Sequence, residues 1–508
     1  MPNGAPRLPM IRSDSSRAIL TSLFLALGQI VGVATYLLLT PILFQYLGER
    51  AFGVYQFAQR LSAFGGFTNL SATTYLKIRL SALRRLPEPD PKRLAVGVCV
   101  VQWALWLPAM LIFLGVATQL AVGREPVSGP ESWAVTAIVA LVPIAQLLSI
   151  PNVALFSSNL GYKSVPVAPL AAILSALMVY AGVRAGLGLA GVAGAMYLAA
   201  AFAFVITYRI ASRHLDWFGV NWPSWRDVRS SMRGNVGASV ASFSYMALQQ
   251  IEAVSFGLLF GPAALGRLVI SGAPVHFLEL VVRQFINASI PALAPLVRER
   301  ACERLQALRT EAALVITLLF MFAAAPVILL TKPFVGLWVG SDAFLSAEVV
   351  VALFLVANWR VLAHFDILLL DQAEDFFGKA LVLLFVVCCI GGLLMLLVSG
   401  GDDHVLWAAL LCLGLAVYLL LLQERCSRKL QIARLPLLIW SPSLAALASY
   451  VLHRWVIDYE QGRLQLLLVL LGAETLCLAV AFSSPAMRRA GVQVLSRLGR
   501  FRRDVRRQ

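Results

Sequence analysis

Long apolar runs separated by short polar segments make up most of this chain. A helix that crosses the hydrocarbon core of a bilayer needs about 20 mainly apolar residues, and fourteen stretches meet that requirement. They are approximately 19–44, 52–76, 94–121, 133–156, 165–184, 189–208, 236–260, 267–291, 311–331, 347–370, 380–399, 404–422, 435–453 and 463–482. The pattern predicts an all-α polytopic membrane protein with about fourteen transmembrane helices.

Composition agrees with a membrane location. The chain is 59% apolar and 13% charged, with a mean hydropathy of +0.80, whereas a soluble domain carries roughly 25% charged residues. The net charge of +16 would suggest nucleic-acid binding in a soluble protein. Here the position of the charges matters more than their sum, and no nucleic-acid partner is expected.

The basic residues predict the topology. If successive loops alternate across the membrane, 32 of the 42 Lys and Arg residues fall on the side of the N-terminus and 7 on the other side. Arg309, at the end of the loop that precedes the ninth span, is counted among the 32. Because positive residues stay in the cytoplasm, both termini are expected to be cytoplasmic.

The segments outside the spans are short, and three of them are informative. The first apolar segment is too long for a signal-peptide core and lacks an A-x-A cleavage site, so it is predicted to be retained as a span. The inner loop 209–235 combines arginines with Trp217, Trp222 and Trp225, as expected of an interfacial linker. The basic tail 488–508 has the apolar spacing of an amphipathic helix on anionic lipid.

One polar turn occurs twice between long apolar runs. Leu47–Tyr55 reads LGERAFGVY and Phe260–Leu268 reads FGPAALGRL, each with two glycines five positions apart. Such internal repetition is typical of transporters built from two similar lobes with a site between them. The predicted parts are an N-lobe of six spans (1–235), a C-lobe of six spans (236–434), and a region with two extra helices and the basic tail (435–508).

The first hairpin also carries a family resemblance. An apolar helix, an L-G-x-x-x-[FY]-G-x-[YW] turn and a second helix that ends near a basic loop resemble the Wzx-type polysaccharide flippases of the multidrug/oligosaccharidyl-lipid/polysaccharide (MOP) exporter superfamily. The resemblance is strongest over residues 18–85. It implies transport of undecaprenyl-pyrophosphate-linked oligosaccharide across the bacterial inner membrane, from the cytoplasmic to the periplasmic leaflet, for O-antigen, capsule or exopolysaccharide synthesis.

The resemblance also implies how transport is driven and which partners take part. It implies alternating access driven by a proton or sodium gradient, without a cofactor. The implied partners are membrane lipids, a polysaccharide polymerase and a chain-length regulator. The family's cavity is lined mainly by its first, second, seventh and eighth helices.

Ionisable side chains inside spans are costly, so each is a candidate functional residue. A pyrophosphate needs cations that stay charged when partly dehydrated, which favours arginine. The candidate substrate-binding residues are Arg60, Arg283, Arg360 and Gln249. Structural alternatives remain open: Arg60 can extend to the headgroups, Arg283 can pair with Glu279 on its own helix, and Arg360 with His364 can hold the tenth helix.

Three acids are candidate ion-coupling residues. Glu252 lies deep in the seventh span, Glu279 in the eighth and Asp366 in the tenth. A carboxylate in apolar surroundings can take up a proton near neutral pH, as an ion-coupled exchanger requires. A neutral or arginine-paired structural role is the alternative for Glu252. His276 and His364 are expected to be core histidines.

No catalytic or metal-binding pattern is found. The seven cysteines show neither CxxC spacing nor a Cys/His cluster, which supports neither zinc nor a disulfide framework. The P-loop, GxSxG and HExxH patterns are missing as well. The chain is therefore expected to be a transporter without metal or cofactor and not an enzyme.

Three other functions are alternatives to this one. A lipid II flippase with fourteen spans and a multidrug exporter share the expected fold, and cationic drugs would favour an acidic cavity. A polysaccharide polymerase or ligase would need a long outer loop with catalytic residues, and the outer loops here are short.

Overall fold

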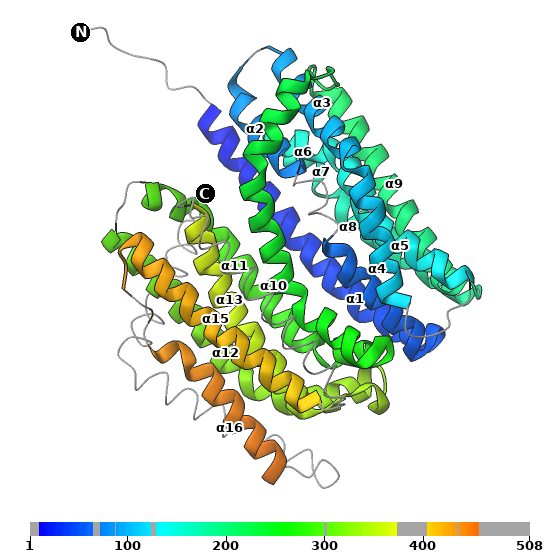
Figure 1. Cartoon of the computed structure of the whole chain (residues 1–508), viewed down its shortest axis with the longest axis vertical. Helices are drawn as coiled ribbons and strands as arrows, with labels where there is room; N and C mark the ends of the chain where they lie inside the picture. The colour runs from blue at the N-terminus through cyan, green and yellow to red at the C-terminus, as the bar shows by residue number, and fades with distance from the viewer. Residues whose placement is uncertain are drawn as a thin grey trace. The chain divides into compact units, whose positions relative to one another are not determined.

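The computed structural model describes residues 10–64, 72–86, 88–122, 129–298, 302–372, 404–433, 435 and 437–456. Within these ranges the regular backbone is helical and contains no strand (Figure 1). The predicted all-α fold is therefore confirmed. The predicted spans 380–399 and 463–482, the tail 488–508 and Cys388, Cys389 and Cys477 lie outside the described residues.

The chain divides into two compact units, residues Met1–Met246 with Gly261–Ala263, and Ala247–Phe260 with Ala264–Gln508. The boundary after Met246 lies inside the long helix α10 (Trp225–Ser271). The first unit also contains α1 (Met10–Ser62), α2 (Ala72–Ala82), α3 (Asp90–Leu105), α4 (Leu107–Val122), α5 (Gly129–Leu148), α6 (Ile150–Ser157), α7 (Gly161–Ser164), α8 (Val167–Arg184) and α9 (Gly188–His214). Helix α8 packs against α9 and α1, and α5 packs against α9 (Figure 1).

The second unit is built around one buried helix. Its further helices are α11 (Ala273–Arg298), α12 (Cys302–Trp338), α13 (Ala347–Gln372), α15 (His404–Leu430) and α16 (Ser441–Val456). Helix α13 packs against α11, α12, α15 and α16. Nearly all of its side chains are buried, so the polar residues on α13 have to find partners on these neighbours.

The two glycines that begin the repeated turns have the same unusual backbone. Gly48 interrupts α1 with φ 76° and ψ 166°, and Gly261 interrupts α10 with φ 85° and ψ 171°. A side chain with a Cβ atom disfavours positive φ, which glycine adopts readily. The sequence repeat therefore corresponds to a repeated break between consecutive helices.

Two of the predicted spans contain a break in the helix just before a proline. The segment 94–121, predicted as one helix, consists of α3 and α4, which meet at Trp106 with a bend of 49°. Pro108 lies at the second position of α4, where its missing N–H costs nothing because no helical partner precedes it. In the segment 133–156, α5 ends before Ser149 and α6 begins just before Pro151.

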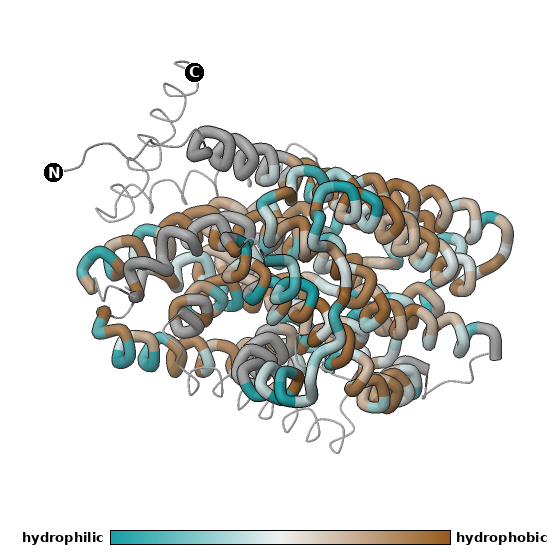
Figure 2. The backbone as a smooth tube through the Cα atoms, turned by 90° about the horizontal axis from the view of Figure 1, so that it is seen from above, coloured by the Kyte–Doolittle hydropathy of each residue, from teal (hydrophilic) through white to brown (hydrophobic). Residues whose placement is uncertain are grey.

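The described helices have the surface of a membrane protein. Eight helical stretches are long and apolar enough to cross a bilayer, and nine if the bent pair α3–α4 counts as one span. Figure 2 shows apolar residues along much of the helical backbone, and large side chains such as Leu38, Ile112 and Leu413 are exposed. Exposure of these apolar side chains to water would be unfavourable, whereas acyl chains can solvate them. The chain is therefore a multi-pass membrane protein.

A compact apolar core in the first unit joins four helices. Leu76 of α2, Cys99 of α3, Leu155 of α6 and Ala211 of α9 belong to one buried apolar cluster, and Trp217 packs against it. The loop that follows α9 is therefore held on this core.

Helix α10 begins with a reciprocal cap. The Ser224 Oγ donates to Asp227 Oδ2 (2.5 Å), and it accepts a hydrogen bond from the Asp227 backbone N–H (3.3 Å). The Ser224 backbone N–H also donates to Asp227 Oδ2 (3.1 Å). This arrangement is a capping box, which satisfies N–H groups left free at a helix start. These hydrogen bonds lower the pKa of Asp227, because they favour the charged carboxylate.

Candidate functional site

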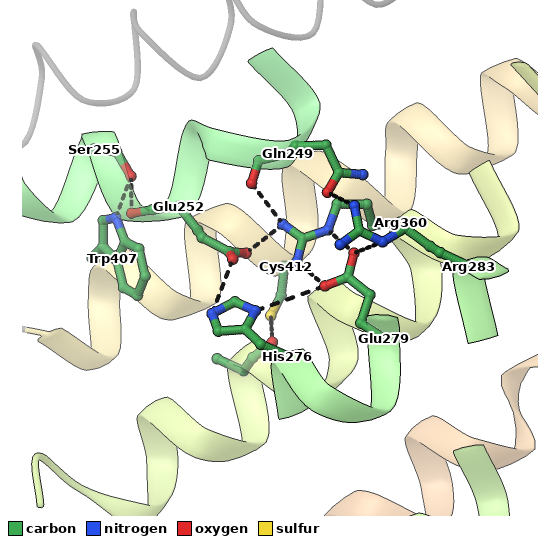
Figure 3. Close-up of polar contacts among 10 residues, drawn as sticks. Gln249, Glu252, Ser255, His276, Glu279, Arg283, Arg360, Trp407 and Cys412 are labelled. Atoms are coloured by element: carbon green, nitrogen blue, oxygen red, sulfur yellow. Dashed lines mark hydrogen bonds and ion pairs between the residues drawn. The ribbon is translucent and has the colours of Figure 1, made fainter. Parts of the chain in front are cut away.

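Arg360 of α13 is the centre of a buried polar cluster in the second unit (Figure 3). Its Nε donates to Glu279 Oε1 of α11 (2.8 Å), and its Nη2 donates to Glu279 Oε2. Its Nη1 donates to Glu252 Oε2 of α10 (2.8 Å) and more weakly to the Gln249 carbonyl (3.4 Å). The Arg360 side chain is nearly fully buried, so these acceptors replace the water that the guanidinium has lost.

Arg283 lies at the partly open edge of the same cluster. Its Nη1 donates to Gln249 Oε1, and its Nε is 3.7 Å from Glu279 Oε1. The Arg283 side chain is 24% exposed, whereas that of Glu279 is 1% exposed. Figure 3 shows Arg283 approaching the cluster from the side opposite to Glu252 and His276. Of the two arginines, Arg283 is thus the more accessible.

His276 lies between the two carboxylates. Its Nε2 is 3.9 Å from Glu252 Oε1, and its Nδ1 is 3.8 Å from Glu279 Oε2. The four charged groups of the cluster balance as two guanidinium and two carboxylate groups when this histidine is neutral. Removal of the buried Arg360 would therefore leave uncompensated charge, which is expensive in a low-dielectric site.

Five of the seven site residues predicted from the sequence meet in this cluster, namely Gln249, Glu252, Glu279, Arg283 and Arg360. The structural alternative for Arg360, that it holds its helix against neighbouring helices, stays open, because the guanidinium joins α13 to Glu279 of α11 and Glu252 of α10. The predicted contact between Glu279 and Arg283 is present at 3.7 Å.

Asp366 lies apart from the cluster, in a closed ion pair. Arg309 of α12 donates from Nε to Asp366 Oδ1 and from Nη2 to Asp366 Oδ2, both at 2.8 Å. Its Nη1 donates to the Ala433 carbonyl (2.9 Å). Counting Arg309 among the cytoplasmic loop cations was wrong, because this residue is buried inside a helix. Sequence reasoning missed it, since it stands just outside the apolar run of the ninth span.

Arg60 belongs to the first unit, in the last turn of α1. It is half-buried and close enough to Tyr36 to act electrostatically on its hydroxyl. One turn away, Gln59 Nε2 donates to Tyr55 Oη (2.7 Å). Arg60 therefore has polar neighbours within its own helix α1, in the first unit.

Comparison with known proteins identifies the fold. No protein-family model and no curated protein matches this chain. Among solved structures, the lipid II flippase MurJ in an inward closed conformation is 12% identical with a TM-score of 0.61, and the match covers 91% of this chain and 98% of that one. This chain therefore has the same overall fold as that structure.

Two further structures support the same fold. A point mutant of the MATE transporter VcmN of Vibrio cholerae is 12% identical with a TM-score of 0.57, covering 83% of this chain and 97% of that one. An inward-facing multidrug resistance MATE transporter of the MOP superfamily is 12% identical with a TM-score of 0.55, covering 82% and 99%. At this identity the likeness establishes architecture alone.

Proposed function

We propose that this chain is a flippase that moves an undecaprenyl-pyrophosphate-linked oligosaccharide from the cytoplasmic to the periplasmic leaflet of the bacterial inner membrane. The observation that carries the proposal is the accessible Arg283 beside a buried, charge-balanced cluster. A guanidinium that is partly open and held by a neutral amide can exchange that amide for a phosphate oxygen at small cost. A fold shared with flippases and exporters supports the transport part of the proposal.

The same cluster offers a way to couple transport to an ion gradient. When Arg283 turns toward a phosphate, Arg360 alone faces the carboxylates of Glu252 and Glu279. The cluster then carries one excess negative charge, which a proton or a sodium ion can neutralise. Release of the phosphate returns Arg283 and expels the cation. Binding of substrate and of cation would therefore be mutually favourable, as linkage requires.

In this scheme the two remaining candidates have different roles. Asp366 is already neutralised by Arg309, so its geometry favours a structural role over ion coupling. Arg60, half-buried near Tyr36, remains a proposed second contact for the polar headgroup. Transport would supply substrate to an extracytoplasmic polymerase, with a chain-length regulator as a further proposed partner.

A transport assay with three substrates tests the proposal. Purified protein in proteoliposomes would be offered a fluorescent pyrophosphate-linked oligosaccharide, lipid II and a cationic dye, with a proton or a sodium gradient imposed separately. Gradient-dependent flipping of the oligosaccharide is expected. A fluorescent phosphatidylcholine serves as a control for unspecific scrambling. Dye export without glycan flipping would make the chain a drug exporter, and preference for lipid II would move it to that flippase class.

A matched pair of variants tests the coupling. Glu252→Gln should abolish the gradient dependence of flipping, because the amide cannot take up a proton. Glu348→Gln removes an acid at the start of α13, the helix that carries Arg360. The Glu348 carboxylate accepts a hydrogen bond from Tyr450 (2.7 Å) outside the cluster, so this variant should leave the coupling intact. Equal gradient dependence in the two variants would exclude Glu252 as the coupling residue.

A further inference from the structure

Lys92, in the first turn of α3, is a buried cation without a carboxylate partner among the described residues. It is 8% exposed. Its Nζ donates to the Leu86 carbonyl (2.7 Å) and lies 5.8 Å from the centroid of the Trp217 ring. An ammonium group has three donors and strong hydration. A carbonyl and an aromatic face replace only part of that hydration, so the charge is left to be matched by something else.

Lys92 lines a pocket of about 480 Å³ in which most of the ionisable lining residues are basic. Arg84, Arg93 and His214 line the same pocket, and Asp216 is the one acid among its lining residues. The walls come from the end of α2, the start of α3 and the ends of α6 and α9. All of these belong to the first unit.

Backbone contacts fix the shape of the pocket. Arg93 Nε donates to the Trp217 carbonyl (3.1 Å), and its Nη2 reaches the Asp216 carbonyl (3.4 Å). Beyond Trp217, the Asn221 backbone N–H donates to the Arg93 carbonyl (3.2 Å). Because these contacts hold the loop after α9 against α3, the cations are already gathered before a ligand arrives, which lowers the entropic cost of binding.

The residues after the pocket indicate its depth in the membrane. Trp222 and Trp225 follow in the same loop and at the start of α10, with exposed fractions of 83% and 63%. Exposed tryptophans of membrane proteins concentrate at the headgroup level. The positive residues of this region lie on the side that the topology analysis assigns to the cytoplasm. The pocket therefore opens where phosphate groups of the inner leaflet are present.

We propose that this pocket binds a phosphate group at the cytoplasmic surface. Lys92 would supply a point charge, Arg84 and Arg93 planar donors, and Ser158 a hydroxyl, while the Trp217 ring forms an apolar wall. Several cations around one volume suit a group with more than one negative charge better than a carboxylate. The ligand is the headgroup of an acidic phospholipid or a soluble phosphate compound, and both have the same recognition chemistry.

Two binding measurements distinguish these sources. In one, the detergent-solubilised protein is titrated with phosphatidylglycerol and the bound lipid is counted by native mass spectrometry. In the other, the protein in phosphatidylcholine nanodiscs is titrated with inorganic pyrophosphate by calorimetry. Binding in the first measurement alone indicates a lipid site, and binding in the second identifies a site open to soluble phosphates. Absence of binding in both would overturn the proposal.

A matched pair of lysine variants localises the site. Lys92→Gln should weaken binding by roughly 10- to 100-fold, because a hydrogen bond to a charged group contributes about 1.5–3 kcal/mol. Lys77→Gln removes the same charge from an exposed position of α2 outside the pocket and should leave binding unchanged. Equal affinities of the two variants would overturn the assignment to this pocket.

A second measurement needs no variant. In the wild-type protein, bound ligand should slow acylation of the Lys92 amine by an amine-reactive reagent relative to Lys77, as read by peptide mass spectrometry. Undiminished acylation at saturating ligand would contradict the proposal even if Lys92→Gln failed to fold. The pocket uses none of the residues of the Arg360 cluster. A negative result for the phosphate pocket therefore leaves the flippase proposal untouched, and the reverse also holds.

Discussion

Arg309 and Asp366 form a two-pronged ion pair in which both side chains are 0% exposed. The pair joins α12 to α13, and the third contact of Arg309, to the Ala433 carbonyl, adds the segment that follows α15. Three parts of the second unit thus meet at one guanidinium.

Removing one partner of this pair should destabilise the protein strongly. Asp366→Asn leaves the Arg309 charge buried and unmatched, and such a change typically costs about 3–5 kcal/mol. The double variant Arg309→Met/Asp366→Leu removes both charges and should recover most of the lost stability. Thermal unfolding in detergent, followed by tryptophan fluorescence, measures both effects.

The same variants separate a structural role of Asp366 from ion coupling. If the pair is structural, the double variant should keep gradient-dependent transport. A double variant that is stable but uncoupled would instead place Asp366 on the ion pathway.

Arg283 should matter more for transport than for stability. Arg283→Ala removes a partly exposed cation, so the loss of stability should be about 1 kcal/mol. Flipping of the pyrophosphate-linked substrate should fall roughly 10- to 100-fold, because a charged hydrogen bond to phosphate is lost. Arg428→Ala, an exposed arginine on α15, is the control. Wild-type transport by Arg283→Ala would remove this residue from the site.

Arg360, in contrast to Arg283, should matter strongly for stability. Arg360→Gln leaves Glu252 and Glu279 without their main counter-charge, with an expected cost of about 3–5 kcal/mol. Adding Glu252→Gln to this variant should restore part of the stability, because fewer unmatched charges remain. A double-mutant cycle on thermal unfolding measures this coupling. Strictly additive effects would contradict the contact at 2.8 Å between Arg360 and Glu252.

Gly48 and Gly261, the positive-φ glycines of the repeated turns, should tolerate substitution poorly. Gly48→Ala and Gly261→Ala should each cost roughly 1–2 kcal/mol, because a Cβ atom strains a left-handed backbone. An added Cβ atom would meet nothing within 4 Å at either position. The loss of stability would therefore come from the backbone conformation alone. Gly32→Ala, in the helical part of α1 with no neighbour within 4 Å, should be neutral or stabilising by about 0.5–1 kcal/mol. A similar effect at all three glycines would contradict the assigned backbone.

The cap of α10 should depend on pH. The hydrogen bonds from Ser224 lower the pKa of Asp227, so the stabilisation is present above the pKa of about 4 of a free aspartate. It is lost as the pH falls through the lower pKa of the folded state. Hydrogen exchange at the start of α10, corrected for intrinsic rates, should reveal fraying below about pH 4. Asp227→Asn should lack this step, and an identical pH profile in both proteins would contradict the expectation.

Residue patterns predicted the helical architecture and most members of the polar cluster. Gly48 and Gly261 stand out because glycine recurs at the same place between apolar runs, and their backbone is a local property. Glu252, Arg283 and Arg360 stand out because charged side chains inside apolar runs are costly and therefore indicate a functional or structural role. Such signals depend on nearby residues alone, so a single sequence contains them.

The pairing of charges could not be predicted in the same way. Arg309 and Asp366 are 57 residues apart in the sequence, so no local pattern links them. Lys92 is one of several basic residues in a predicted loop, and only the packing of Trp217 and the contacts of Arg93 show that it is buried. The breaks at Trp106 and Ser149 were missed because hydropathy stays high across them, although Pro108 and Pro151 were visible signals.

The matching breaks at Gly48 and Gly261 also bear on the history of the chain. Two left-handed glycines, 213 residues apart (from 48 to 261), are simplest to explain by duplication of a gene for a half-length ancestor. No other amino acid adopts this backbone without strain. In a chain that arose by duplication, the glycine of each turn would therefore be the position least free to change.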